Sequence, residues 1–302
     1  MHSAKNYSRM NLIHKIIVLG LVLLTASCGQ PSENIENTSE SIDIFQNPFN
    51  LEESIRLRKR RAIEEQYSAY KMQLYKVLED ALVIANQNFN KDQFIANYEV
   101  SIDSIPIRVE LNLDYHFSRT YPHLIVRRNE PTATFIDIYR KGENKFEKEI
   151  AHEQWLLTYV NDTIRDINGD GLNDFVVNWY GSSGCCLKAF SNVYLLREDK
   201  KAFSPNFEFI NPTFSPKEKI IRGVCYGHPT ETEMYKYKWN GEKVDTIEYV
   251  SYERNENGLT GKILIATGEG WESNYKILKR LNSVPAEYRR IEGYFWFTDN
   301  FK

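Results

Sequence analysis

The chain has 302 residues, of which 26% are charged and 13% aromatic, and its formal net charge is −3. This length and composition allow a sizeable buried core, and with no basic excess we expect no nucleic-acid partner. The 19 Tyr and 16 Phe residues favour β structure, and they also suit contacts with carbohydrate or protein.

The first 28 residues have the form of a lipoprotein signal peptide. Basic residues precede the apolar run 16–24, which is shorter than the roughly 20 residues that span a bilayer. Thr25-Ala-Ser-Cys28 then resembles the bacterial lipobox, in which the cysteine is lipidated. We expect acyl chains such as palmitate on Cys28, and a membrane anchor through them. The alternative is an ordinary signal peptide with an incidental cysteine.

The expected location is therefore the bacterial cell envelope. Gly29, directly after the lipobox cysteine, resembles a signal for the outer membrane, but the sequence does not show which face of that membrane the protein occupies. Residues 29–50 are polar with few large apolar side chains, which predicts a flexible tether.

Residues 51–90 are predicted to form one long amphipathic helix. The segment has no Gly or Pro up to Asn88, and apolar residues recur in steps of four and three. These residues are Ile63, Tyr67, Tyr70, Leu74, Val77, Ala81 and Ile84. Such a stripe favours docking on the chain's own domain, with a coiled coil as the alternative. Glutamates four residues away balance the positive charge of the basic run Arg56–Arg61, so we expect this face of the helix to be exposed to solvent.

In residues 95–302, apolar residues recur at every second position, which is typical of strands. Strands are expected at 105–113, 123–126, 134–139, 155–160, 175–180, 192–196, 233–239, 244–252, 262–266 and 275–278. Asn240-Gly241 is a strong hairpin signal. The predicted fold class is mainly β: an antiparallel propeller-like or sandwich-like β domain preceded by one long amphipathic α-helix. Periodicity alone does not choose between propeller, sandwich and barrel.

The segment 166–174 has the residue pattern of a calcium loop. Asp166, Asn168, Asp170 and Asp174 supply side-chain oxygens at positions 1, 3, 5 and 9, and position 7 adds the carbonyl of Leu172. Ca²⁺ takes six to eight oxygen ligands, and a glycine at position 6 allows the sharp turn. The strand-like sequence that follows resembles the calcium hairpins of integrin-type propeller repeats rather than an EF-hand. A turn of Asp, Asn and Gly without an ion is the alternative.

Three cysteines follow Cys28. Cys185 and Cys186 are adjacent, and Cys225 lies about 40 positions later in the chain. In an oxidising envelope we expect Cys225 to form a disulfide with one of the adjacent pair. A Cys₃His zinc site that includes His228 is the alternative, although adjacent cysteines do not easily place both sulfurs on one tetrahedral ion.

The calcium loop and the residues after it, through Gly181-Ser-Ser-Gly-Cys-Cys186 and Asn192-Val-Tyr-Leu-Leu196, resemble a family of bacterial envelope proteins. These are related to the periplasmic immunity lipoprotein of the Xanthomonas type IV secretion system. The resemblance extends to 235–244 and covers about half of the mature chain. It implies a propeller-like β fold with one calcium loop and inhibition of a lysozyme-like hydrolase. The long helix and the segment 288–297 are not part of that pattern.

Three kinds of function follow from these features. The first is a lipid-anchored calcium-binding inhibitor or immunity protein against a peptidoglycan hydrolase, in which the ion stiffens the loop Gly181–Gly184. The second is a glycan-binding or adhesive surface lipoprotein. Its candidate sugar platforms are Trp179, Tyr180, Trp239 and Trp271. The partner would thus be a hydrolase or a glycan.

The third kind of function is catalysis, which we do not expect. His116, His123, His152 and His228 lie in no His-Glu-x-x-His pattern, and there is no Gly-x-Ser-x-Gly motif. A pair of carboxylates for glycoside hydrolysis stays open, because its members need not be close in sequence.

Overall fold

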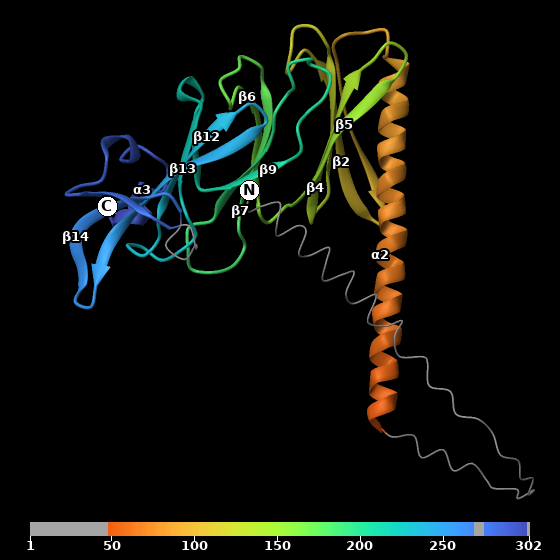
Figure 1. The fold of residues 1–302 in the computed structure, drawn as a ribbon. Helices are drawn as coiled ribbons and strands as arrows, with labels where there is room; N and C mark the ends of the chain where they lie inside the picture. Colours follow the sequence, from red (N-terminus) through yellow and green to blue (C-terminus); the bar gives the residue numbers. More distant parts are fainter. Residues whose placement is uncertain (1–47, 269–274, 301–302) are drawn as a thin grey trace, which may run out of the picture. The chain divides into compact units, whose positions relative to one another are not determined.

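The computed structural model describes residues 48–268 and 275–300, which fall into two compact units that meet in sequence between Tyr75 and Lys76. The expected signal peptide, Cys28 and nearly all of the expected tether lie outside the described residues. Within the described ranges, no helix is both long and apolar enough to cross a membrane. The fold is mainly β, with one long helix ahead of three antiparallel sheets (Figure 1).

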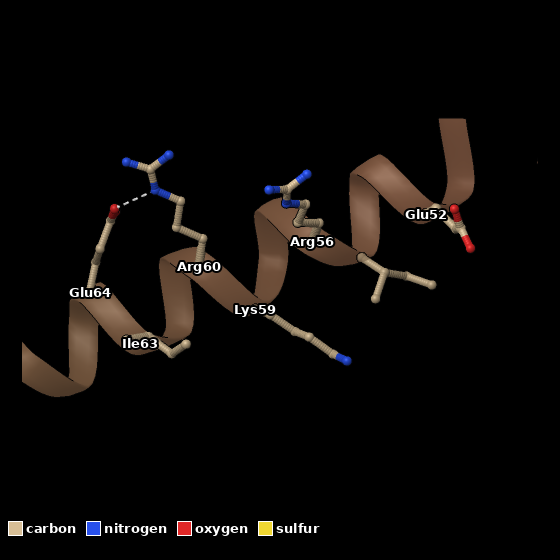
Figure 2. A pocket seen from close by; sticks show the side chains of 7 residues that line it. Glu52, Arg56, Lys59, Arg60, Ile63 and Glu64 are labelled. Atoms are coloured by element: carbon tan, nitrogen blue, oxygen red, sulfur yellow. Dashed lines mark hydrogen bonds and ion pairs between the residues drawn. The ribbon is translucent and has the colours of Figure 1, made fainter. Parts of the chain in front are cut away.

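The long helix α2 spans Pro48–Gln87, close to the predicted bounds. Its apolar stripe is exposed at Ile63 and Tyr67 but buried at Val77 and Ala81. The expected docking of the stripe is therefore seen in its C-terminal turns. Sequence spacing also predicted charge pairing along the helix, and Arg60 Nε lies 2.9 Å from Glu64 Oε1. Figure 2 shows these charged side chains around a shallow hollow whose walls come from this one helix.

The first sheet contains five strands in chain order. They are β1 (Phe94–Ile102), β2 (Ile105–Asp114), β3 (His123–Asn129), β4 (Ala133–Lys141) and β5 (Phe146–Trp155). The second sheet contains β6 (Tyr159–Arg165), β7 (Asp174–Tyr180), β8 (Ala189–Tyr194) and β9 (Phe207–Ile210). Every neighbouring pair is antiparallel, as expected for strands joined by short turns.

The third sheet runs from β10 (Pro212–Ser215) through β11 (Ile220–Val224), β12 (Met234–Asn240), β13 (Lys243–Asn255) and β14 (Gly258–Ala266) to β15 (Ile277–Leu281). The predicted hairpin at Asn240-Gly241 is confirmed, because Asn240 pairs with Lys243 and Gly241 has φ +60°. Three short helices complete the fold: η1 (Pro216–Glu218), η2 (Ala286–Tyr288) and α3 (Tyr294–Thr298).

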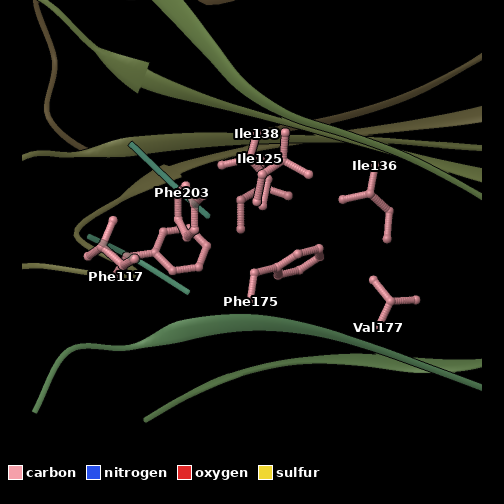
Figure 3. Packing of buried hydrophobic residues seen from close by; sticks show 9 residues of the cluster. Phe117, Ile125, Ile136, Ile138, Phe175, Val177 and Phe203 are labelled. Atoms are coloured by element: carbon pink, nitrogen blue, oxygen red, sulfur yellow. The ribbon is translucent and has the colours of Figure 1, made fainter. Parts of the chain in front are cut away.

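The first hydrophobic core lies between the first and second sheets. Figure 3 shows Phe175 and Val177 of β7 on one side, with Ile125, Ile136 and Ile138 of β3 and β4 opposite. All five side chains are at most 1% exposed. This packing of one sheet on another is sandwich-like.

The second core uses the other face of β7. Val176, between Phe175 and Val177, packs in a cluster with Ile221 and Tyr235 of the third sheet. Because successive side chains of a strand point to opposite faces, a strand buried on both sides must be apolar throughout. This explains the run Phe175-Val-Val177, and it places the second sheet between two cores. The described residues form neither a closed barrel nor a propeller.

The C-terminal segment covers the far face of the third sheet. Tyr288 and Phe297, both 0% exposed, pack in a third cluster with Val250 and Ile265. The segment 288–297, which the family resemblance did not explain, therefore has a structural role as a cover for that sheet.

One predicted strand, 155–160, is wrong. Trp155 ends β5, Leu156–Thr158 form a turn, and β6 begins at Tyr159. The alternating pattern crosses from the first sheet to the second. Trp155, Leu156, Leu157 and Val160 are therefore exposed, while Tyr159 packs against the first core. Two further predicted strands, 192–196 and 275–278, are displaced by a few residues from β8 and β15.

Candidate functional site

The predicted calcium loop connects β6 to β7 and folds around its own carboxylates. Asp166 accepts the backbone N–H of Gly169 at 2.6 Å and that of Gly171 at 3.0 Å. Asp170 accepts the N–H of Leu172 at 2.8 Å. The acidic side chains therefore lie on the inner side of the turn, facing its N–H groups.

The two glycines of the loop both adopt left-handed backbone conformations, with φ +77° at Gly169 and +85° at Gly171. Gly171 is the predicted position 6, and open space surrounds it. Gly169 has a second requirement, because a Cβ there would lie 2.1 Å from the carbonyl oxygen of Pro216. The loop thus packs directly on η1.

Asp174 differs from the other acidic residues of the loop because it is completely buried. Its two carboxylate oxygens accept the N–H groups of Ile167 and Leu196, each at 2.9 Å. The pKa of Asp174 is raised to about 7, mainly by burial and to a smaller extent by the charges of Asp170 and Asp166, against the lowering effect of those two hydrogen bonds. The carboxylates therefore repel one another across the loop.

The residues of the loop fit a hard cation in donor type and in charge. Asp166, Asn168, Asp170 and Asp174 would hold Ca²⁺ together with the carbonyl of Leu172, and the ion would neutralise the carboxylates. In the structure, however, the three carboxylates do not form a group whose oxygens all lie within 4.8 Å of one another. Binding would require these carboxylate oxygens to move closer to a common centre.

The described cysteines all carry thiols, so the expected disulfide from Cys225 is not formed in this structure. Cys225 directly follows β11 and packs against the second core. The Sγ atoms of Cys185 and Cys186 lie 3.4 Å apart, and Cys185 Sγ is 3.9 Å from Nδ1 of His228. The bridge stays a prediction for oxidising conditions, while the structure brings the adjacent pair to His228 instead.

The cysteine pair differs in its surroundings. Cys185 is exposed and Cys186 is buried. Burial raises the pKa of Cys186, and the neighbouring Cys185 raises it further, whereas hydrogen bonds from Tyr226 and from the backbone of Gly227 lower it.

The turn between β5 and β6 forms an exposed apolar surface that the sequence did not predict. It consists of Trp155, Leu156, Leu157, Val160 and Tyr180, which we call the apolar tip; their exposed fractions are 56%, 39%, 83%, 59% and 43%. Val160 belongs to it because the register of β6 on β7 shifts between Tyr159 and Asn161, which leaves Val160 unpaired.

Two of the aromatic residues proposed as sugar platforms, Trp179 and Trp239, already contact other side chains of the protein. Trp239 is 3% exposed within the second core. Trp179 stacks on Phe190 at 4.2 Å, and its Nε1 donates to Asn192 at 2.5 Å. Trp271 lies outside the described residues. Tyr180 alone of these candidates belongs to the apolar tip.

Among the described residues, His116, His123 and His152 each contact a different partner. His123 is fully buried, with Nδ1 2.9 Å from the carbonyl oxygen of Tyr121. Nδ1 of His152 lies 2.8 Å from the hydroxyl of Tyr194, and Nε2 of His116 lies 3.4 Å from the carbonyl of Asn112. Each of these contacts joins neighbouring parts of the β structure.

Comparison with known proteins finds one solved structure that resembles this chain weakly. No protein-family model and no curated protein match this chain. One matching solved structure is described as the structure of a Xanthomonas type IV secretion system related protein. It is 15% identical, with a TM-score of 0.30, over 61% of this chain and 93% of the other. The class of protein rests on the fold itself: a mainly-β chain in which one long helix precedes three antiparallel sheets in the sequence.

Proposed function

We propose that this protein is a lipid-anchored, calcium-binding protein of the bacterial cell envelope that inhibits a peptidoglycan hydrolase by binding it. The apolar tip is the binding surface in this proposal, and it is the observation that carries it. Cys28 carries the anchor, and the chain acts without catalysis of its own.

The apolar tip has the composition of a protein-binding site. Isolated exposed apolar residues are common, but contiguous groups mark interaction surfaces. Trp155 ends β5 and Leu157 lies two residues later in the turn. Tyr180 is next to this turn because its N–H donates to the carbonyl of Thr158 at 2.7 Å. Aromatic residues are enriched among those that dominate binding energy.

The turn is also held by hydrogen bonds, which would reduce the entropy lost on binding. The N–H of Leu156 donates to Thr132 O at 2.8 Å, and the N–H of Thr158 donates to Trp155 O at 2.9 Å. The hydroxyl of Thr158 donates to the same carbonyl at 2.8 Å. These bonds fix both ends of Leu156–Thr158 to the first sheet.

Calcium would act at the opposite end of the same strand. Asp174 is the first residue of β7 and Tyr180 is the last. An ion held by Asp166, Asn168, Asp170, Asp174 and the Leu172 carbonyl would fix the start of β7 and so stiffen the strand that leads to Tyr180 and to the loop Gly181–Gly184. The resemblance of this stretch to the envelope immunity proteins supports a hydrolase as partner.

The test is an inhibition assay with the full chain, purified in detergent, against a lysozyme-like muramidase encoded by the same organism. We expect near-stoichiometric inhibition. Leu157→Asp should weaken it more than tenfold, as expected for a residue near the centre of an interface. Ile95→Asp is the matched control, because Ile95 is also exposed, at 70%, but lies on β1. Equal inhibition by the two variants would contradict the assignment of the surface.

The alternative is a glycan-binding surface lipoprotein, and the exposure of Trp155 favours it, since an exposed indole can stack on a sugar ring. Inhibition and polysaccharide-binding assays on the same preparation separate the two proposals. Failure to inhibit any muramidase of the organism, combined with polysaccharide binding that is lost in Trp155→Ala, would favour the glycan.

A further inference from the structure

Cys185, Cys186 and His228 form a compact cluster, which we call the Cys₂His cluster. It is the one group of three or more His, Cys, Asp or Glu side chains in the described residues whose ligand atoms lie within 4.8 Å of one another. Its members come from two loops, one between β7 and β8 and the other between β11 and β12. Residues more than forty positions apart thus meet beside the third core.

The distances within the cluster lie within about 0.4 Å of those in a coordination sphere where they are resolved atom by atom. An ion at about 2.3 Å from sulfur and about 2.0–2.1 Å from nitrogen, with tetrahedral angles, holds two sulfurs about 3.8 Å apart and sulfur and nitrogen about 3.6 Å apart. The sulfurs here are 3.4 Å apart, and Cys185 Sγ lies 3.9 Å and 4.0 Å from the two nitrogens of His228. The adjacent cysteines therefore place both sulfurs where one ion could bind them, contrary to the expectation from their spacing.

The loops that carry the cluster are held in place by hydrogen bonds. The carbonyl of His228 accepts the N–H of Thr232 at 3.0 Å, and the carbonyl of Gly227 accepts the indole N–H of Trp296 at 2.8 Å. Tyr226 and the backbone of Gly227 hydrogen-bond to Cys186. The site is therefore supported by its own loop and by α3.

The other loop is fixed by its backbone. Gly184, directly before the pair, has φ +100°, and a Cβ there would lie 2.8 Å from Nζ of Lys188. The N–H of Gly181 donates to the carbonyl of Lys188 at 2.9 Å and closes the loop. The ammonium group of Lys188 thus lies against Gly184, the residue that directly precedes the two thiols.

We propose that the Cys₂His cluster binds one thiophilic d¹⁰ cation, Zn²⁺ or Cu⁺, through both sulfurs and the imidazole. Thiolate and imidazole are the ligands that select such ions over Ca²⁺ and Mg²⁺. Because Cys185 and His228 are exposed, a further coordination position faces solvent. Binding releases the two thiol protons to solvent. This site is separate from the calcium loop, which lies at the other end of β7.

The test uses the reduced full chain in detergent, with excess Ca²⁺ present to occupy the calcium loop. Zn²⁺ and Cu⁺ are titrated in separate experiments against a chromophoric chelator, and Co²⁺ is added to a third sample as a spectroscopic probe for thiolate ligands. We expect one equivalent of at least one of the two ions to bind, with release of protons and with a thiolate-to-cobalt absorption band.

Cys185→Ser and His228→Ala should each weaken binding by more than tenfold, since loss even of an outer-shell partner costs about 10–100-fold. Both side chains are exposed, so the fold is expected to tolerate these changes. Cys225→Ala is the matched control, because it also removes one thiol but should leave the affinity unchanged.

Three results would overturn the proposal: no stoichiometric binding of either ion by folded, reduced protein, equal affinity in Cys185→Ser and His228→Ala, or an equal loss in Cys225→Ala. None of them bears on inhibition of a muramidase, so this inference and the proposed function stand or fall separately.

Discussion

The carboxylate of Asp174, the first residue of β7, accepts the N–H of Leu196 at 2.9 Å, in the segment that follows β8. Its other oxygen accepts the N–H of Ile167 at the same distance. One buried side chain therefore joins the loop, the start of β7 and the chain beyond β8. A residue proposed as a calcium ligand thus also has a structural role that needs no ion.

Asp174→Ala should lower the free energy of unfolding even in EDTA. The change leaves two buried N–H groups without acceptors, at about 1–3 kcal/mol each, so we expect a loss of about 2–6 kcal/mol in urea unfolding. Asp170→Ala is the control, because Asp170 is exposed and its loss should cost about 1 kcal/mol or less in EDTA. Equal losses would contradict the structural role of Asp174.

Calcium should raise the melting temperature of the protein, and Asp170→Ala should abolish that rise. Ion binding to the folded state alone stabilises by mass action, by about 2.7 kcal/mol at a hundredfold excess over Kd. Because the pKa of Asp174 is about 7, Ca²⁺ must displace a proton at pH 5.5, so the stabilisation should be smaller there than at pH 8. Identical melting in calcium and in EDTA at both pH values would contradict a calcium site.

Alanine substitutions at Gly169 and Gly171 separate the cost of a left-handed backbone conformation from the cost of a close contact with η1. Gly171→Ala should cost about 1 kcal/mol, because only the left-handed conformation opposes it. Gly169→Ala should cost about 3–5 kcal/mol, because its Cβ would also overlap the carbonyl oxygen of Pro216. Chemical denaturation of both variants in EDTA measures the difference, and equal costs would show that η1 does not constrain the loop.

The sequence predicted those elements whose pattern is local. The helix, the hairpin at Asn240-Gly241 and most of the central strands were identified because apolar spacing and turn residues are encoded over a few positions. β5 was missed because its exposed face carries charged residues, and β1 because its side chains alternate between half-buried and exposed. Edge strands of this kind have a weak apolar signal.

The candidate sites were predicted less completely, for a different reason. The calcium loop is contiguous, so its residue types were visible in the sequence, but the burial of Asp174 depends on Leu196 and on the second sheet. The Cys₂His cluster depends on two distant loops that meet only in the folded chain, and no spacing rule encodes that contact. The apolar tip was not predicted, because its apolar pattern was interpreted as a buried strand. An exposed turn that joins two sheets can have the same pattern.

The anchor prediction concerns Cys28, which lies outside the described residues. Cys28→Ser should move the protein from the detergent phase to the soluble envelope fraction, since the acyl chains are the expected anchor. Cys225→Ser is the control and should stay in the detergent phase. Continued membrane partitioning of Cys28→Ser would point to a retained apolar segment.

The stability of the protein should fall in mild acid because of His123. This side chain is 0% exposed, and the rings of Phe117 and Phe203 lie edge-on to it at 5.1 and 5.9 Å. The pKa of His123 is lowered to about 4 from an ordinary value of 6.5, mainly by burial and to a smaller extent by the charges of His116 and Arg140, against the raising effect of the hydrogen bond with Tyr121.

The folded state therefore holds His123 neutral while the unfolded chain takes up a proton below pH 6.5. Its contribution to stability is complete above pH 6.5 and is lost as the pH falls toward 4, by about 3 kcal/mol in all. His123→Gln, which cannot titrate, should be less stable at pH 7.5 but should lose less stability between pH 7.5 and pH 4.5 than the parent chain. Urea unfolding at both pH values measures these differences, and an unchanged slope in His123→Gln would assign the acid sensitivity to other groups.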